Sequence, residues 1–161
     1  NQDLHTRIVD SAFSDEYFQL YQRYIDSRHG DGSMANPTPD DYSNFLLNDW
    51  SQTVFIESRK GQQLLSVAVV DFMPTGLSAV YTFFDPKEHK RSLGTFAILQ
   101  QIWLAQLYQL PHIYLGYWIP HHPKMDYKCH FRALEILQGS EWQSFDSDLK
   151  KHLIYIKSLG Q

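Results

Sequence analysis

The chain has 161 residues, a formal net charge of -4 at pH 7 and an aromatic content of 15%. This length is typical of one domain whose core needs no covalent staples. The single cysteine, Cys129, excludes an internal disulfide framework and a multi-cysteine metal site, and it indicates a reducing, cytoplasmic compartment. The acidic balance excludes a protein that grips long nucleic acid through phosphates alone, and no apolar run is long enough to span a membrane.

The N-terminal part of the sequence predicts a strand and two helices. Residues 1–12 are a polar lead with weak apolar alternation, which suits an edge strand. Ser14 is placed to cap a helix that ends near His29, where glycines and polar residues follow. Pro39 is typical of a first helical position, and Asp41 completes a capping box for a second, shorter helix.

An antiparallel meander of three strands follows. We expect strands over residues 53–58, 64–70 and 78–84, because β-branched and aromatic side chains dominate them and turn residues separate them. The middle segment is apolar almost throughout, which predicts a central strand covered on both faces.

A crossover completes the predicted sheet. After a charged loop at residues 87–90, a helix is expected over residues 96–108, with one face formed by Phe96, Leu99, Trp103 and Leu107. A strand over residues 112–116 comes next. Because strand, helix and strand form one crossover, this last strand should lie parallel to the strand at residues 78–84.

The C-terminal part is less regular. We expect a short helix over residues 125–132, a strand over residues 135–137, Trp142 as a late core residue and an amphipathic tail from Ser144. The whole order of elements predicts one α+β domain, with a mixed, mostly antiparallel sheet flanked by helices. That order is similar, at the level of fold, to acyltransferases of the GNAT type.

Asp71 is the first candidate for chemistry, because it follows the apolar segment at residues 64–70. A carboxylate at the end of such a strand, beside a cleft, accepts a proton or holds an ammonium group. Aspartate is equally suited to a turn before Met73 and Pro74, where it bonds local amides. The residue pattern leaves both interpretations open.

Residues 91–95 are a candidate anion site at a helix N-terminus. Backbone N–H groups there favour an anion, Gly94 permits close approach, and Ser92 and Thr95 add hydroxyl donors beside Arg91. An ordinary helix start capped by Ser92 explains the pattern as well, since the glycine is single and no P-loop signature is present.

Aromatic and basic residues follow the last predicted strand. Tyr117 offers an aromatic face beside Gly116, and Lys124, Lys128 and Arg132 recur every four residues, as on one helix face. Lys128 and Arg132 are candidates for holding a phosphate, with a base stacked nearby. The alternative is a solvated basic face, which is the interpretation adopted for Lys124.

Histidine and cysteine predict no metal site. His121 and His122 are adjacent in a proline-flanked loop, which makes a poor ligand pair. Cys129 and His130 are neighbours on a predicted helix and should point apart, so Cys129 is assigned a structural role.

Arg28 is a further candidate at the C-terminal end of the first helix. Together with Tyr24 and His29, it suits either the negative end of the helix dipole or the lining of a cleft. Composition does not separate these two interpretations.

Four blocks stand out in order along the chain: SAVYTFFDP at residues 78–86, SLGT at 92–95, YLGYWI at 114–119 and MDYK at 125–128. Together with Arg28, His29 and the FLL at residues 45–47, they resemble the C-terminal domain of the aminoacyl-tRNA–protein transferases. The resemblance extends from about Tyr17 to Trp142. The wording of the first block is most similar to the aspartate/glutamate leucyltransferase branch, which is related to the arginyl-tRNA–protein transferases.

The resemblance implies a GNAT-like fold and peptide-bond formation without a ribosome. The α-amine of an acceptor protein's N-terminal Asp or Glu attacks the aminoacyl ester at the 3′ end of Leu-tRNA, and the added residue marks the acceptor for degradation. Asp71 and Tyr81 are then the expected catalytic residues. Arg28, Tyr117, Lys128 and Arg132 are expected to bind substrate, and the 3′ end of the tRNA is expected at Arg91, Ser92, Gly94 and Thr95.

Residues 1–161 are expected to form a single GNAT-like transferase domain from the C-terminal part of a longer protein. Family members carry an N-terminal cysteine-rich region, with roles in activity and metal or cofactor binding, that this sequence lacks. No metal and no cofactor are expected in this part, and no membrane partner. The sequence departs from the family at Ala133, where a proline often follows the arginine, and this affects only the local turn.

Three alternatives remain open. The donor is Arg-tRNA if the chain belongs to the arginyl branch. A coenzyme A–dependent N-acetyltransferase would place a glycine-rich loop at residues 91–96, but Phe96 stands where a small residue belongs. A non-catalytic module that recognises N-terminal residues would use the same surface without chemistry.

Overall fold

The structure is a computed structural model that describes residues 1–30, 32–47, 49–120, 122 and 124–145. The chain divides into two compact units, Asn1–Gly116 and Tyr117–Gln161. The first unit holds a five-stranded sheet with its helices, and the second holds a two-stranded sheet. That residues 1–161 make a single domain remains a prediction.

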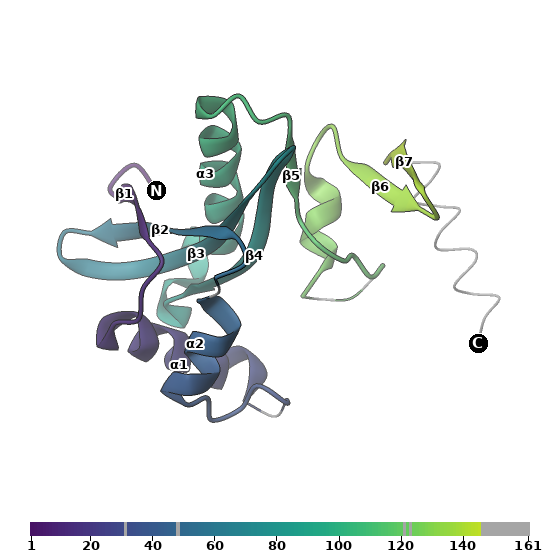
Figure 1. Ribbon diagram of the computed structural model, residues 1–161. Helices are drawn as coiled ribbons and strands as arrows, with labels where there is room; N and C mark the ends of the chain where they lie inside the picture. The colour runs from purple at the N-terminus through teal and green to yellow at the C-terminus, as the bar shows by residue number, and fades with distance from the viewer. Residues whose placement is uncertain (31, 48, 121, 123, 146–161) are drawn as a thin grey trace. The chain divides into compact units, whose positions relative to one another are not determined.

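The sheet of the first unit is mixed and mostly antiparallel, as predicted (Figure 1). Its strands lie in sequence order: β1 (His5–Asp10), β2 (Gln52–Lys60), β3 (Gln63–Met73), β4 (Gly76–Phe84) and β5 (His112–Tyr114). The first three pairings are antiparallel, whereas β4 and β5 are parallel. The edge strand, the meander, the parallel crossover and the α+β class are therefore confirmed, while the GNAT-like assignment stays a prediction.

The first two helices begin where the capping residues place them. The helices are α1 (Asp15–His29), α2 (Pro39–Leu46) and α3 (Leu93–Leu107). Ser14 Oγ accepts from the Tyr17 amide at 3.2 Å, and Thr38 and Asp41 form the predicted capping box. The expected charged loop is a 3₁₀ helix, η1 (Pro86–Arg91), and α3 begins three residues earlier than predicted.

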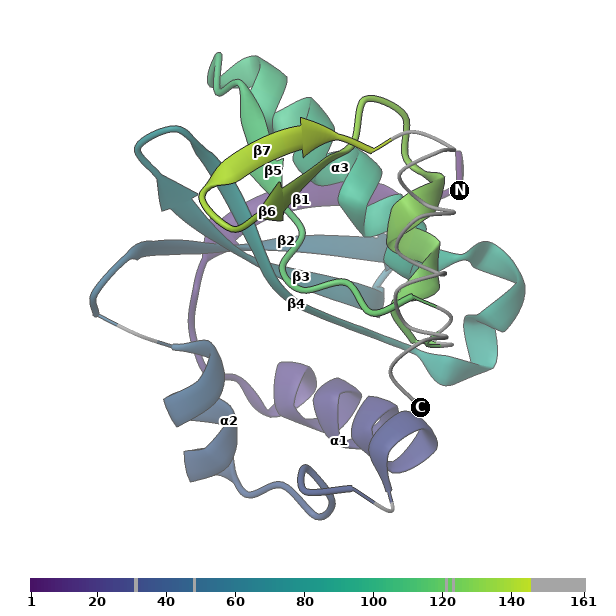
Figure 2. The ribbon, with the colours of Figure 1, turned by 90° about the vertical axis from the view of Figure 1, so that its right-hand side faces the viewer.

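The helices cover both faces of the sheet (Figure 2). On one face, α1 and α2 pack with β2 to β4 around a core that includes Leu20, Tyr42, Phe55 and Phe83, all with no exposed surface. On the other face, α3 packs against a second core of strand residues, among them Val70. Central strand β3 is therefore buried on both faces, as its apolar sequence predicts. None of the helices described here is long and apolar enough to cross a membrane.

Strands β4 and β5 pair over only a short stretch. The parallel ladder runs from Gly76 opposite His112 to Ser78 opposite Tyr114. Gly76 permits this close approach, because a Cβ there would lie 2.4 Å from the His112 carbonyl oxygen. The β3–β4 register shifts between Val69 and Val70, so Val80 is the extra residue of a bulge in β4. On its other edge, β4 has no ladder partner beyond Ser78 within the described residues.

The second unit contains η2 (Asp126–His130) and a hairpin of β6 (Glu135–Gln138) and β7 (Glu141–Ser144). The strand near residues 135–137 is confirmed, but the helix expected over residues 125–132 is only one short 3₁₀ turn. Trp142 lies in β7 with 54% of its surface exposed, so its assignment to the core is wrong. The predicted tail helix, with Leu149, Leu153 and Ile156, lies outside the described residues.

A candidate active site on the helix-covered face of the sheet

Asp71 is buried in the middle of the sheet, with 2% of its surface exposed. It pairs with Thr53 on β2 and with Ser78 on β4, and β3 continues as far as Met73. The interpretation of Asp71 as a turn residue is therefore wrong. Since residues alternate between faces along a strand, Asp71 lies on the same face as Val69, the face that α1 and α2 cover.

A hydroxyl holds the Asp71 carboxylate. Thr53 Oγ1 donates to Asp71 Oδ1 at 2.5 Å, and Ser51 Oγ lies 3.1 Å from Thr53 Oγ1. A buried carboxylate is costly without such partners, and a hydroxyl bond fixes its orientation. The sequence does not predict this contact, because its two residues lie 18 positions apart on different strands.

Tyr81 lies on β4 opposite Val69, one step along the same face from Asp71 and Ser78. Aromatic rings of α1 and α2 enclose it, with centroids at 5.1 Å for Phe45, 6.1 Å for Tyr24 and 6.2 Å for Tyr21. Its hydroxyl is buried and has no hydrogen-bond partner among the described residues. Burial also raises the pKa of Tyr81, so the hydroxyl stays protonated. The Tyr81 hydroxyl is thus a hydrogen-bond donor that no described residue uses.

Arg28 lies at the far end of β4. Its guanidinium carbon is 5.5 Å from the centre of the Phe84 ring and 5.9 Å from that of Tyr24, within the range of a cation–π contact. Phe84 also approaches the start of α3, because a Cβ on Gly94 would lie 3.5 Å from its ring. Phe84 therefore links Arg28 to the predicted anion site.

The start of α3 has no side-chain cap. Ser92 adopts a left-handed conformation, with φ 51° and ψ 47°, and its side chain makes no capping bond. The interpretation of Ser92 as a cap is therefore wrong, and the first helical N–H groups, around Gly94 and the exposed Thr95, are left for other acceptors. These N–H groups can bind an anion. A Cβ on Gly94 would make only ordinary contact with Phe84, so packing within the protein does not require glycine there.

Arg91 is occupied by carboxylates. Its guanidinium donates to both oxygens of Asp3, at 2.8 and 2.9 Å, and its Nε donates to Glu88 at 2.6 Å. The hydrogen bonds to Asp3 and Glu88 raise the pKa of Arg91, and the bond from Arg91 lowers the pKa of Asp3 to about 2. The positive charge of Arg91 is therefore balanced within the protein.

The remaining predicted residues lie in the second unit. Lys128 Nζ donates to the Tyr117 carbonyl oxygen at 2.6 Å, and burial lowers the pKa of Lys128. The Tyr117 side chain is 91% exposed, and Arg132 is also exposed. Since η2 ends at His130 and is not an α-helix, the prediction that Lys124, Lys128 and Arg132 share one helical face is wrong.

A group of possible metal ligands lies in η2. One ligand atom each of Asp126, Cys129 and His130 lies within 4.8 Å of the others. The expectation that Cys129 and His130 point apart is therefore wrong. Their O, S and N atoms are donors that zinc accepts, but Cys129 Sγ also bonds the Asp126 carbonyl oxygen at 2.9 Å. The absence of a metal and of a cofactor remains a prediction.

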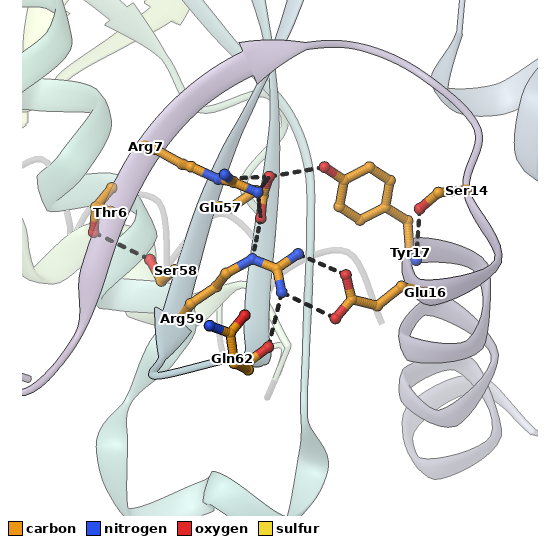
Figure 3. A network of polar contacts seen from close by, with 9 residues as sticks. All are labelled: Thr6, Arg7, Ser14, Glu16, Tyr17, Glu57, Ser58, Arg59 and Gln62. Atoms are coloured by element: carbon orange, nitrogen blue, oxygen red, sulfur yellow. Dashed lines mark hydrogen bonds and ion pairs between the residues drawn. The ribbon is translucent and has the colours of Figure 1, made fainter.

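Glu57 is a second buried carboxylate that the sequence did not reveal (Figure 3). It accepts from Arg7 Nε at 3.1 Å, from Arg59 Nε at 2.5 Å and from the Tyr17 hydroxyl at 2.8 Å. Arg59 also binds Glu16 at 2.6 Å. The two arginines and two glutamates of this network balance one another, so it joins β1, β2 and α1 rather than presenting a reactive group.

The family model described as "Arginine-tRNA-protein transferase, C terminus" matches residues 16–138. The chain belongs to this family.

Several relatives carry the name aspartate/glutamate leucyltransferase. The chain is 52% identical to that of Stenotrophomonas maltophilia (strain K279a), over 92% of this chain and 62% of the relative. It is 51% identical to that of Hahella chejuensis, over 88% and 61%, and 52% identical to that of Pseudomonas fluorescens (strain Pf0-1), over 88% and 60%. The chain therefore spans about three fifths of the length of these relatives.

Proposed function

We propose that the protein carrying this chain transfers leucine from Leu-tRNA to the N-terminal Asp or Glu of acceptor proteins. The observation that carries the proposal is the 52% identity to relatives named for this activity. Two residues on one face of the sheet support it: the buried Asp71, held by Thr53, and Tyr81, whose hydroxyl has no partner among the described residues. Amide formation from an ester needs such positioning and proton transfer. The reaction takes place in the cytoplasm, and the added leucine marks the acceptor for degradation.

In the proposed reaction, the acceptor's α-amine attacks the carbonyl carbon of the aminoacyl ester. A C–N bond forms, the ester C–O bond breaks, and the 3′-hydroxyl of the tRNA leaves. Asp71 takes the proton that the amine loses and passes it to the departing 3′-oxygen, which leaves as the hydroxyl. Tyr81, which its raised pKa keeps protonated, donates to the oxygen on which negative charge develops.

In this proposal, the start of α3 and Arg28 bind the substrates. The uncapped start of α3 receives the phosphate of the terminal adenosine at Ser92, Gly94 and Thr95. Arg28 binds the side-chain carboxylate of the acceptor's first residue. Because Arg91 is already neutralised, its part is to hold η1 to Asp3 rather than to bind phosphate. These assignments belong to the first unit alone.

The second unit contributes further contacts in this proposal. Tyr117, exposed over 91% of its surface, provides a stacking face, and Lys128 and Arg132 meet phosphate or acceptor carboxylate. Lys128 must leave the Tyr117 carbonyl oxygen to do so.

The test supplies the full-length protein with radiolabelled Leu-tRNA or Arg-tRNA and with peptides that begin with Asp, Glu or Ala. We expect leucine on the Asp and Glu peptides and none on the Ala peptide. The absence of leucyl transfer, with charged tRNA shown to be intact, contradicts the proposal. Arginine transfer in its place would contradict only the identity of the donor.

A further inference from the structure

Helix α3 has an unusual composition for a helix with an exposed side. None of its 15 residues, LGTFAILQQIWLAQL, carries a charge. A helix on the surface of a protein normally carries charged residues on its outer face, whereas a helix that is apolar all round is covered on all sides. The sheet covers one side of α3 through residues such as Leu104, which has no exposed surface.

The opposite side of α3 is exposed. Leu99, Trp103 and Leu107 follow one another at intervals of four residues, so they form one stripe along the helix. They are 50%, 54% and 59% exposed. Three large apolar side chains in a row are more than the scattered exposed residues of an ordinary surface, and such stripes mark contact with another protein surface.

The sheet face beside α3 is also incompletely covered. A helix is about 10 Å wide and strands are spaced by about 4.8 Å, so one helix covers about two strands of a sheet. Helix α3 packs mainly against β3, β4 and β5 (Figure 1). On the same face, Ile56 of β2 is 3% exposed and packs in the α3 core, whereas Ile8 of edge strand β1 is 39% exposed. Edge strand β1 therefore has no helix over this face in the described part of the chain.

A groove lies at this uncovered border. It has a volume of about 410 Å³ and is lined by Thr6, Ile8 and Ile56 from the strands and by Gln100, Trp103 and Leu104 from α3. Among the described residues, one charged residue lines the groove: Arg7, whose guanidinium is bound to Glu57. A lining of this kind suits apolar side chains and does not attract phosphate groups.

We propose that this surface, the groove with the stripe of Leu99, Trp103 and Leu107, is the docking site for the part of the full-length protein that lies outside this chain. The matching family model describes a C terminus, and the relatives are longer than the chain, which covers only 60% to 62% of them. A segment of the same polypeptide reaches the groove at a high effective concentration, so a modest apolar contact is enough to hold it. Docking would fix the transferase fold to the remainder of the protein through α3.

The test uses the full-length protein with photo-reactive benzoylphenylalanine in place of Trp103, and a control protein with the same probe in place of Trp50, which is 75% exposed. After illumination, mass spectrometry identifies the linked peptides. We expect the probe at position 103 to link to residues outside residues 1–161 of the same molecule and the probe at position 50 to give none of these links. Links to a second copy, seen as a covalent dimer, would overturn the proposal.

A second measurement, thermal unfolding, tests the docking without the photo-reactive probe. In the full-length protein, Trp103→Glu should lower the midpoint of thermal unfolding by about 5 °C, because it places a charge in a covered apolar contact. Trp50→Glu should leave the midpoint unchanged, and Trp103→Phe should retain most of the stability. No effect of Trp103→Glu would contradict the docking, whatever the outcome of the transferase assay, so this result is independent of the proposed function.

Discussion

Thr53 holds Asp71 through a hydrogen bond of 2.5 Å between Thr53 Oγ1 and Asp71 Oδ1, across the β2–β3 ladder. Threonine has one hydroxyl hydrogen, and it is used in this bond. Ser51 Oγ, at 3.1 Å, must therefore donate to Thr53 Oγ1 while the carboxylate is ionised. The order of donors orients Asp71 before any substrate arrives.

Removing the hydroxyl should reduce catalysis. Thr53→Val keeps the shape of the side chain but frees the carboxylate to rotate, and we expect the turnover rate of leucyl transfer to fall about tenfold. Thr53→Ser keeps the donor and should restore most of the rate. Steady-state kinetics of the full-length protein measure this, and a Val variant as fast as the wild type would show that the bond is only structural.

Tyr81→Phe should have opposite effects on stability and activity. The buried hydroxyl has no partner among the described residues, so its removal should raise the free energy of unfolding by up to about 1 kcal/mol. Transfer should slow at least tenfold, because a donor to the developing charge is lost. Tyr42→Phe is the matched control. The Tyr42 hydroxyl is also buried and has no partner among the described residues, so this variant should be more stable without slower transfer. Equal rates for both variants would remove Tyr81 from the mechanism.

Gly94→Ala should separate packing from binding of the tRNA. A Cβ at this position would make only ordinary contact with Phe84, and alanine favours the helix, so the midpoint of thermal unfolding should not fall. If phosphate approaches the backbone here, the KM for aminoacyl-tRNA should rise severalfold. An unchanged KM would exclude a close approach at Gly94.

The Glu57 network should make stability depend on pH. Burial opposes ionisation, but hydrogen bonds from Arg59, Tyr17 and Arg7 lower the pKa of Glu57 below its ordinary value of 4.5. The native state therefore holds fewer protons on this group, and its stabilisation, complete above pH 4.5, is lost as pH falls through the lowered value.

The variant Glu57→Gln tests this dependence (Figure 3). It leaves the arginines without their buried partner, and we expect a loss of about 3 kcal/mol at pH 7 that shrinks in acid. Glu16→Gln, whose side chain is 51% exposed, should cost less than about 1 kcal/mol. Denaturant unfolding at pH 7 and below pH 4 measures the stability of both variants. If Glu57→Gln lost the same stability at each pH, the pH dependence would not arise from Glu57.

Local patterns predicted most of the fold. The cap at Ser14 and the capping box at Asp41 depend on neighbouring residues, and the apolar run in β3 reflects burial on both faces. These signals lie within one element, which is why the sequence alone shows them. The parallel strand β5 followed from the rule for crossovers.

The contacts between elements could not be predicted in the same way. Thr53 and Asp71 meet only because β2 and β3 pair in one register. Strand β3 runs two residues past Asp71, and this length decides between Asp71 as a turn residue and Asp71 as a buried strand residue. For α3, periodicity identified a face of large apolar residues, but Leu99, Trp103 and Leu107 lie away from the sheet, and smaller residues such as Ala97 and Ala105 pack onto it.

The most direct test of the account is the rate of leucyl transfer by Asp71→Asn in the full-length protein. Asparagine keeps the size of the side chain and still accepts from Thr53, but it cannot take a proton at neutral pH. We predict a fall in kcat of about 100-fold or more with the midpoint of thermal unfolding nearly unchanged. A variant that folds normally and transfers leucine at the wild-type rate would contradict the assignment of Asp71 as the base.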